Sequence, residues 1–573
     1  MAYTLIKKSL PIGVLMENEF LFFIQEPLEF PLDESITVVN SLPEDKYIVA
    51  NIKSDKIDRY AHEINYYIKN TKDSIANKIE NIRTLYEARI VAYGLAQDID
   101  YTQEVGKKVL IISGDKEDKL IEKLEQDGYV CATLHPDEIN DINGHIGKLS
   151  VATTKLLRGD LQTDQIVWQN APAFAMKQSG VYDPSVDGWD KVIDTLYKNS
   201  NIYHYKNYVH YDPNICQYNE RILSETCGKC EEVCPTVAIV KIDEQKHLEF
   251  SDIDCHGCGG CVSVCPSGAL DFTQMPRDAL IEVASFYKNH KILLLPSGVE
   301  IDDVLLPKGV LPLGIDGRKY LHEAHFMTLL QKSGNAVIFY TDFVSKGTGD
   351  AIRIINEIFD RKYSKKAIYI CQNKEELEKA LSKAESIEEC RFDFDDSGMR
   401  KRESFTYRLA HLVGDDNLGV VETGEHIHYG NIVINEDKCT LCMSCVGACN
   451  VAALTAHPED QTLKFNPSIC TNCGYCEVVC PEDECLSIVY DKLALRPDYF
   501  TKNTMAQDEL FACVECGVEF ATKKSIEKIA SMMIPRFGDN EAKIRTLYCC
   551  AECKPKVMLQ AEMDQSNKEN SNG

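Results

Sequence analysis

Cysteine is the residue type through which this chain can do the most chemistry. The sequence has 25 cysteines among 573 residues, and residues 1–200 contain only Cys131. Most of the others gather in three clusters further along the chain. The sequence begins without a secretory signal, so we expect a reducing compartment, where disulfides are rare. Clustered thiols in such a compartment indicate metal binding.

The clearest cluster spans about 430–492 and contains two runs with the spacing C-x2-C-x2-C-x3-C. The second run, followed by Pro481, repeats the first at a constant offset of 31 residues (470 − 439 and 480 − 449). A cubane [4Fe–4S] cluster takes one thiolate at each of its four irons, and the fourth cysteine of each run serves the other run's cluster. The predicted ligand sets are quartet 3 (Cys439, Cys442, Cys445 and Cys480) and quartet 4 (Cys449, Cys470, Cys473 and Cys476).

These paired runs closely resemble the motifs of bacterial two-cluster ferredoxins. The resemblance implies the ferredoxin fold, two [4Fe–4S] cofactors and one-electron transfer for this part of the chain. Asn450 stands where that family usually has proline after the fourth cysteine. Because the proline is not a ligand, the departure leaves the predicted ligand count unchanged.

The cluster at 201–275 has one complete run, which consists of Cys255, Cys258, Cys261 and Cys265, with Pro266 after it. An incomplete run lies 31 residues earlier (258 − 227) and consists of Cys227, Cys230 and Cys234. Position 224, where its first cysteine should stand, is serine, and we expect Cys216 to replace it while residues 217–226 loop out. The predicted sets are quartet 1 (Cys216, Cys227, Cys230 and Cys265) and quartet 2 (Cys234, Cys255, Cys258 and Cys261).

Two alternatives to the Cys216 ligand remain open. Cys216 is a free thiol in the first, and the site then holds a three-iron cluster or takes another ligand. Ser224 supplies an oxygen ligand in the second, which is the rarer case because thiolate suits these clusters better.

The third cluster has two C-x2-C pairs, Cys513 with Cys516 and Cys550 with Cys553. Four thiolates in two such pairs suit a closed tetrahedral zinc site, here in a zinc-ribbon-like element, and we expect a helix between the pairs. A rubredoxin-like iron site is the second interpretation, and a site without metal is the third. Cys549 could compete as a ligand, but it breaks the two-residue spacing.

The remaining cysteines outside these sets are interpreted as incidental thiols: Cys131, Cys371, Cys390 and Cys485. Gly347 and Gly349 precede a predicted helix, where backbone amides can hold a phosphate. An ordinary turn between a strand and a helix is the preferred interpretation of those two glycines.

The elements around the cysteines predict a multidomain chain of α+β and α/β parts. Strand-turn-helix-strand patterns indicate α/β units, including a parallel sheet in the region from 276 to 390. The predicted order is an N-terminal α/β region of unknown role (1–200), a first ferredoxin-like module (201–275), an α/β region (276–390), an acidic connector (391–429), a second ferredoxin-like module (430–492), the zinc-like domain (505–560) and a disordered tail (561–573).

Charge and cofactors together predict the function class. The net charge of −27 argues against nucleic acid as a partner, because nucleic acid is recognised by clusters of Lys and Arg. No apolar run is long enough for direct membrane insertion, and we expect a cytoplasmic protein. Four [4Fe–4S] clusters and one Zn²⁺ predict a polyferredoxin that exchanges electrons with a redox enzyme or carrier, such as a formate dehydrogenase- or hydrogenase-type complex.

Two other functions compete with this electron carrier, which would have no substrate site of its own. One is a catalytic oxidoreductase subunit that holds a flavin or another cofactor in an α/β region. The other is a redox-sensing or assembly factor whose clusters report on oxygen or iron.

Overall fold

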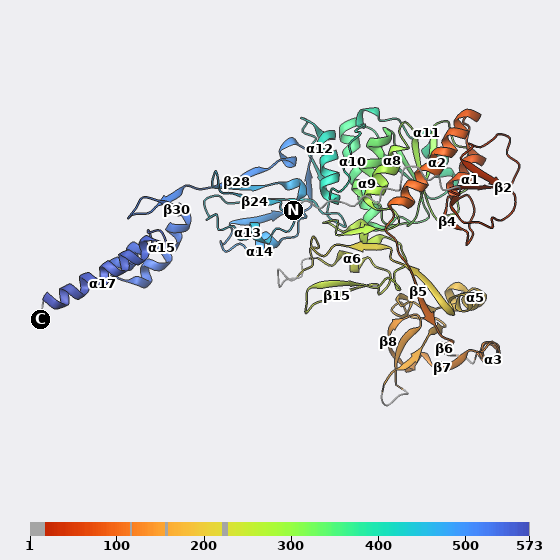
Figure 1. Cartoon of the computed structure of the whole chain (residues 1–573), viewed down its shortest axis with the longest axis horizontal. Coiled ribbons are helices and arrows are strands. Elements are labelled where there is room, and N and C mark those ends of the chain that lie inside the picture. Colours follow the sequence, from red (N-terminus) through yellow and green to blue (C-terminus); the bar gives the residue numbers. More distant parts are fainter. Residues whose placement is uncertain (1–17, 115–116, 155–158, 220–226, 572–573) are drawn as a thin grey trace.

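The computed structural model describes residues 18–571, apart from 115–116, 155–158 and 220–226 and the side chains of 564–571. Figure 1 shows a central α/β body, a smaller lobe attached to it, and an arm that extends through the second cysteine-rich module to the C-terminus. The chain is thus a mixed α/β protein of several domains. No helix in the described ranges is long and apolar enough to cross a lipid bilayer.

The central body is built on a parallel sheet in the order β19-β18-β20-β21. Its strands are β18 (Lys291–Pro296), β19 (Val310–Ile315), β20 (Val337–Tyr340) and β21 (Ile368–Cys371). Nearly every residue of the first three strands is apolar and buried, as expected when helices cover both faces of a parallel sheet. This is the sheet that the sequence predicts for the region from 276 to 390.

Five helices surround this sheet: α8 (Arg277–Ser285), α9 (Glu323–Ser333), α10 (Lys346–Tyr363), α11 (Lys374–Lys383) and α12 (Lys401–Val413). All residues of α9 are buried, because α8, α10 and α12 all pack against it. Its position makes α9 the central helix of the body (Figure 1).

The stretch predicted as an acidic connector, 391–429, belongs to the core of this body. Within it, the side chains of Asp396 and of Arg408, which belongs to α12, are both completely buried. The distance from Arg408 Nη2 to Asp396 Oδ1 is 2.5 Å. Arg408 Nε also donates to Asp396 Oδ2 at 2.9 Å. A two-point ion pair satisfies both charges, so an acidic sequence is accommodated inside the fold.

The N-terminal region predicted as one unit divides into two parts. Its first part supplies a second parallel sheet in the order β2-β1-β3-β4, with strands β1 (Phe20–Phe23), β2 (Ile36–Val39), β3 (Tyr47–Ala50) and β4 (Ile57–Tyr60). Helices α1 (His62–Asn70) and α2 (Ile75–Leu95) pack on β19 and α8 of the central body. A buried pair of Glu63 and Arg89, with Nε to Oε1 at 2.6 Å, joins these two helices.

The second part of that region forms the smaller lobe. It contains the expected βαβ unit, with β6 (Lys108–Ile112), α3 (Asp118–Gln126) and β7 (Val130–Leu134) in a parallel sheet of order β12-β11-β6-β7. The other two strands are β11 (Gln165–Trp168), which lies next to β6, and β12 (Val181–Tyr182), which lies at the edge of the sheet. An antiparallel pair, β5 (Asp100–Val105) and β13 (Asn201–Lys206), connects the lobe to the body (Figure 1).

Each cysteine-rich module consists of small antiparallel sheets and two helical turns. The first has α6 (Lys229–Glu232) and α7 (Gly260–Val264), with hairpin β15 (Ile239–Ile242) and β16 (His247–Phe250). The second has α13 (Ser444–Ala448) and α14 (Tyr475–Val478), with hairpin β24 (Leu454–His457) and β25 (Thr462–Phe465).

The C-terminal arm begins where β28 (Asn503–Gln507) pairs with β25 of the second module. A short hairpin, β29 (Leu510–Ala512) and β30 (Glu519–Thr522), is followed by α15 (Lys523–Phe537), α16 (Glu541–Thr546) and α17 (Cys553–Ser571). The tail predicted as disordered from 561 is thus helical to Ser571. Its Gln, Glu, Met and Lys residues have good helix propensity, which a reading based on polarity alone overlooks.

Candidate metal centres

Quartet 1 lines a cavity of about 360 Å³ in the first module. All four cysteines of the predicted set contribute to its wall, so Cys216 lies with Cys227 and Cys230 of the incomplete run and with Cys265 of the complete run. Burial raises the pKa of the Cys216 thiol, although hydrogen bonds with the Tyr211 side chain and the Tyr218 backbone oppose the rise. Ser224, the alternative ligand, lies outside the described residues.

The turn before Cys216 has the same form as the turn before Cys470. Asn214 N donates to Asp212 Oδ1 at 2.9 Å, and Ser468 N donates to Asn466 Oδ1 at 3.1 Å. The sequences of the two turns are DPNIC and NPSIC, and sequence analysis missed this likeness. It supports Cys216 as the first cysteine of its run, with the insertion placed after it.

Quartet 2 lines a second cavity, of about 470 Å³, in the same module. Burial raises the pKa of the Cys261 thiol well above its usual value, and the neighbouring cysteine thiolates raise it further. His256 also lines this cavity, and burial lowers the pKa of its imidazole.

Quartet 3 lines a cavity of about 340 Å³ in the second module. Cys442 of this quartet is exposed, whereas the other fifteen cysteines of the four quartets are buried or half-buried. Cys485, interpreted as incidental, lines the same cavity, and its thiol donates to the Asn435 carbonyl at 3.7 Å. Its spacing from Cys480 matches no ligand pattern, so the sequence carries no signal for this neighbour.

Quartet 4 is brought together beside quartet 3. Burial raises the pKa of the Cys476 thiol, and the thiolates of all three other members raise it further. Cys445 of quartet 3 acts on the same thiol, just as Cys230 of quartet 1 acts on Cys261 of quartet 2. The two quartets of each module are therefore neighbours.

Left-handed backbone shapes three of the four cysteine loops. The residues concerned occur as the pairs Gly257 and Gly259, Leu441 and Met443, and Asn472 and Gly474, each with φ between 54° and 87°. Leu441 and Met443 rarely adopt this conformation, so the shape of their loop is imposed by its context. Gly228, which corresponds to Gly259, instead has φ of −165°. The incomplete run thus turns differently from the others.

The donor sets fit [4Fe–4S] clusters. Each quartet offers four soft thiol donors at one place, which is what a cubane cluster requires. Burial makes the free thiolates unfavourable, so bound iron would supply the positive charge that compensates them. Such a cluster would give each site the ability to take up or release one electron.

The beginning of α12 adds two buried cations between the modules, and sequence analysis did not identify them. Lys401 Nζ donates to the carbonyls of Ser263 and Cys265 at 2.9 and 3.1 Å. Arg402 Nε donates to the Pro266 carbonyl at 3.3 Å, and its charge helps to hold down the pKa of Cys470 against the larger effect of burial. Positive charge at these points would favour a reduced cluster, because reduction adds negative charge.

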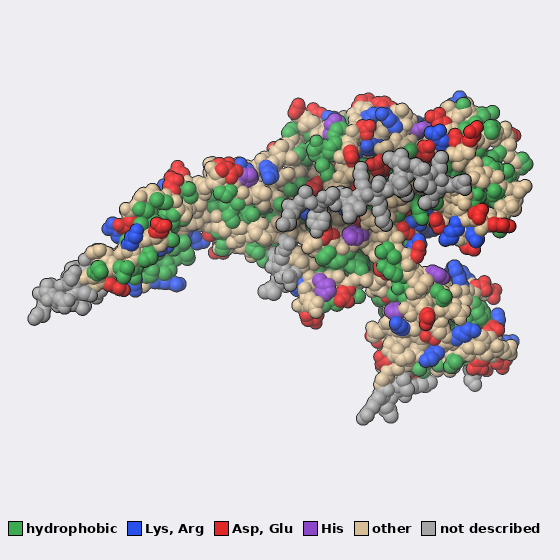
Figure 2. Space-filling model, viewed as in Figure 1, with side chains coloured by type: hydrophobic (Ala, Val, Ile, Leu, Met, Phe, Trp, Pro, Cys, Tyr) green, Lys and Arg blue, Asp and Glu red, His purple; other side chains and the backbone are tan. Residues whose placement is uncertain are grey.

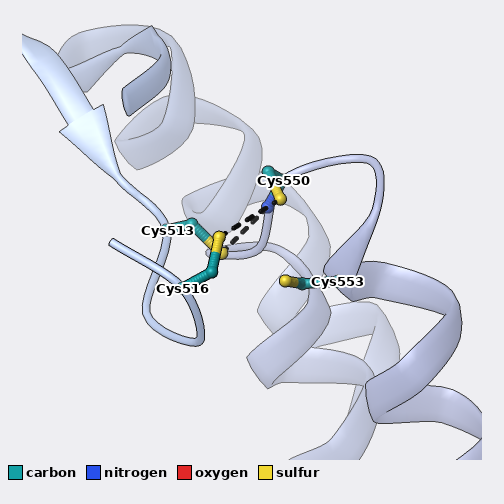
Figure 3. A group of neighbouring side chains, drawn as sticks. All are labelled: Cys513, Cys516, Cys550 and Cys553. Carbon is teal, nitrogen blue, oxygen red and sulfur yellow. Dashed lines mark hydrogen bonds between the residues drawn. The ribbon is translucent and has the colours of Figure 1, made fainter. Parts of the chain in front are cut away.

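The four predicted cysteines of the C-terminal arm also lie together (Figure 3). Their sulfur atoms are all within 4.8 Å of one another, and the Cys516 and Cys550 sulfurs are 3.7 Å apart. Burial raises the pKa of the Cys513 thiol, but backbone N–H groups, including that of Cys550, donate to the sulfur and bring its pKa down to about 6. Four sulfurs at this spacing, one of them readily ionised, fit a tetrahedral Zn²⁺ or iron site.

Cys549 makes a different contact from its neighbour. Its thiol donates to the Arg545 carbonyl at 3.3 Å, within the turn that ends α16, and its side chain is buried. Cys550 belongs to the group of four sulfurs, as the two-residue spacing predicts.

The first module covers the carboxyl edge of the central sheet. Lys319 N, in the loop after β19, donates to the Cys258 carbonyl at 2.9 Å. A Cβ on Gly347, at the start of α10, would lie 2.5 Å from Ser263 Oγ, so glycine is required for close packing there. Ligands of open α/β sheets bind outside this edge. Ser263 of the first module packs against Gly347 and so occupies the position at the start of α10 that a bound phosphate would need.

Both modules match a known protein domain. Residues 198–269 and 438–483 match the 4Fe–4S dicluster domain. The chain therefore carries two ferredoxin-type modules. This confirms the prediction made from the two repeats, while the ligand sets and the number of clusters remain predictions.

Two curated proteins are similar to a short part of the chain. Indolepyruvate oxidoreductase subunit IorA from Pyrococcus abyssi is 44% identical over 50 residues, which are 9% of this chain and 8% of that protein. The subunit of the same name from Thermococcus kodakarensis is 44% identical over 48 residues, 8% of this chain and 7% of that protein. The chain thus spans less than a tenth of the length of these relatives.

Proposed function

We propose that this chain is an iron–sulfur electron-transfer protein that holds one [4Fe–4S] cluster at each of its four quartets. The observation that carries the proposal is the gathering of sixteen cysteines into four sites, two in each dicluster domain. A single cluster can serve structure or catalysis, but a series of neighbouring clusters is suited to moving electrons one at a time.

The partner in this proposal is a cytoplasmic redox enzyme or carrier. The similarity to indolepyruvate oxidoreductase subunits favours an oxidoreductase of that kind, beside the formate dehydrogenase- and hydrogenase-type complexes suggested by the sequence. The exposed Cys442 makes quartet 3 the site through which a docked partner would most readily exchange electrons.

The C-terminal sulfurs are assigned to a structural Zn²⁺. A closed set of four thiolates leaves no open coordination position for a substrate, as in other structural zinc sites. The competing proposal, a flavin in the central α/β region, finds less support, because the first module covers the sheet edge where such a cofactor would bind.

Anaerobic purification followed by elemental analysis tests the function. We expect about sixteen irons and sixteen sulfides per chain from four cubane clusters, about one zinc, and no released flavin. Electron paramagnetic resonance (EPR) of the dithionite-reduced protein should show interacting reduced clusters. An iron content of about eight or less in protein purified with reconstituted clusters would contradict the proposal, and a stoichiometric flavin would favour the catalytic alternative.

A further inference from the structure

Three hydrogen bonds join the segment around Cys216 to the second module. Asn450 Nδ2 donates to the Cys216 carbonyl at 3.2 Å, and Gln217 Nε2 donates to Asn450 Oδ1 at 3.0 Å. The Tyr475 hydroxyl donates to the Gln217 carbonyl. The Cys216 carbonyl also accepts a bond from Asn219 of its own module. The segment is therefore held from both sides.

This contact is buried and specific in direction. Gln217 is 2% exposed and Tyr475 is 1% exposed, so water competes little for these hydrogen bonds. The Asn450 amide both donates and accepts, which fixes its orientation between a carbonyl and an amide group. Proline, the residue usual at this position in the two-cluster ferredoxins that the runs resemble, could make neither bond.

Cys216 needs such support more than the first cysteines of the other runs. In those runs, the next cysteine follows after two residues, and the short loop sets the position of the first thiol. Cys227 follows Cys216 only after ten residues (227 − 216 − 1), so the loop is a weak restraint on Cys216. The contacts from Asn450 and Tyr475 lie at the point where that restraint is missing.

We infer that Asn450 and Tyr475 are positioning residues for the displaced ligand Cys216, so that the second module completes the metal site of quartet 1. The inference rests on the proposed function in one respect, the assignment of Cys216 as a ligand. Asn450 follows Cys449, and Tyr475 precedes Cys476, so both positioning residues belong to the loops of quartet 4.

The test compares Cys216→Ser, Asn450→Pro and Gln217→Ala in the full chain, purified and reconstituted anaerobically. Asn450→Pro removes the bridge but supplies the residue that ferredoxins carry at this turn, so quartet 4 should still load. Gln217→Ala removes one bond from the side of the first module, and it keeps the test decisive if the proline variant fails to fold. Gln507→Ala is the matched control, since this exposed amide on β28 donates to the Asp460 carbonyl of the second module.

We expect Cys216→Ser to lose about one iron of sixteen and to gain a three-iron EPR signal when oxidised, as for a cubane cluster lacking one ligand. The two bridge variants should show the same signal, and the control should not. The variants at Asn450 and Gln217 should lose the iron partially, and addition of excess iron should restore it. If Cys216→Ser shows this signature while both bridge variants keep the full iron content, the positioning role is wrong and the ligand assignment stands. If Cys216→Ser itself is unchanged, the ligand assignment fails and the inference fails with it.

Discussion

At the scale of single residues, the cysteines were the most predictable part of the molecule. The 31-residue offset identified three complete runs and the incomplete one, and the structure places the predicted members of each quartet together. Cys216 was found because an exact repeat lacked one member. The neighbouring Cys485 was not found, because its approach to quartet 3 depends on the pairing of β23 (Asn431–Ile434) with β26 (Leu486–Val489), which spacing cannot reveal.

Cys485 is predicted to be a neighbour of the quartet 3 cluster and not a ligand. Cys485→Ala should leave the iron content unchanged, whereas Cys480→Ser should lower it by about one to four irons as the cluster loses a ligand. Iron analysis of the anaerobically purified variants measures this difference. Loss of a whole cluster from Cys485→Ala would show that the ligand set has been misassigned.

At the scale of elements, α12 is the helix that the sequence described least well. The residues from 391 onward are rich in Asp, which suggested an exposed connector. The burial of α12 depends instead on the pairing of Arg408 with Asp396, 12 residues earlier, and on contacts with α9. The first turn of α12 then presents Lys401 and Arg402 to backbone carbonyls of the first module. The composition of residues 391–429 predicted a connector, and it did not indicate the depth at which this helix packs.

The ion pair between Arg408 of α12 and Asp396, which precedes that helix, should contribute strongly to stability. Arg408→Ala leaves Asp396 buried without its cation, and such a loss costs about 3–5 kcal/mol. We expect a matching decrease in the free energy of unfolding of the central body, measured by urea denaturation of the anaerobic protein. Arg83→Ala is the control, because Arg83 pairs with Glu87 on the surface of α2 and such pairs contribute about 1 kcal/mol or less.

The Arg83→Ala variant shows how much the free energy of unfolding decreases when an exposed arginine is removed. Equal effects of Arg408→Ala and Arg83→Ala would contradict the buried pair.

The C-terminal helix α15 packs on the loop that carries Cys439 and Cys442. Thr522 and Ser525 donate to the Thr440 carbonyl at 3.1 and 2.7 Å, and Lys528 pairs with Glu482. The four-sulfur site lies on both sides of this helix in the sequence, so a metal there would hold α15 against quartet 3.

Removal of the metal from the C-terminal site should therefore increase the mobility of α15 and of the quartet 3 loop that it contacts. Cys516→Ser is expected to abolish zinc binding and to increase amide hydrogen exchange in residues 523–537 and 438–443 by about tenfold or more, since each tenfold change corresponds to about 1.4 kcal/mol. The iron content should remain that of the unmodified protein. Unchanged exchange in the second segment after zinc loss would show that the two sites are independent.

At the scale of the whole molecule, the sequence predicted the modules but not their arrangement. The two ferredoxin-type modules lie more than 150 residues apart in the chain (438 − 269), yet residues 216–217 contact Asn450 directly. Contacts of this kind arise from the packing of the central body between the modules. No local pattern of spacing or polarity specifies them.

The overall charge should govern the encounter with a partner. Acidic and basic side chains are interspersed on the face that Figure 2 shows, and the chain has 89 Asp and Glu residues against 62 Lys and Arg, for a net charge of −27. If the partner presents a basic patch, the association rate should fall about tenfold or more between low salt and 0.5 M salt, because at the higher concentration ions screen the attraction beyond about 4 Å. Stopped-flow measurement of electron transfer at several salt concentrations tests this, and a rate independent of salt would exclude electrostatic steering.

The exposure of Cys442 also determines how the protein ages in air. Dioxygen reaches a cluster most easily through the sulfur that solvent already touches, and the damage begins there. None of the cysteines of quartets 1 and 2 is exposed, so clusters held there would survive longer. A chain exposed briefly to air would then keep the clusters of quartets 1 and 2 and lose the cluster of quartet 3. It would lack the site through which a docked partner exchanges electrons.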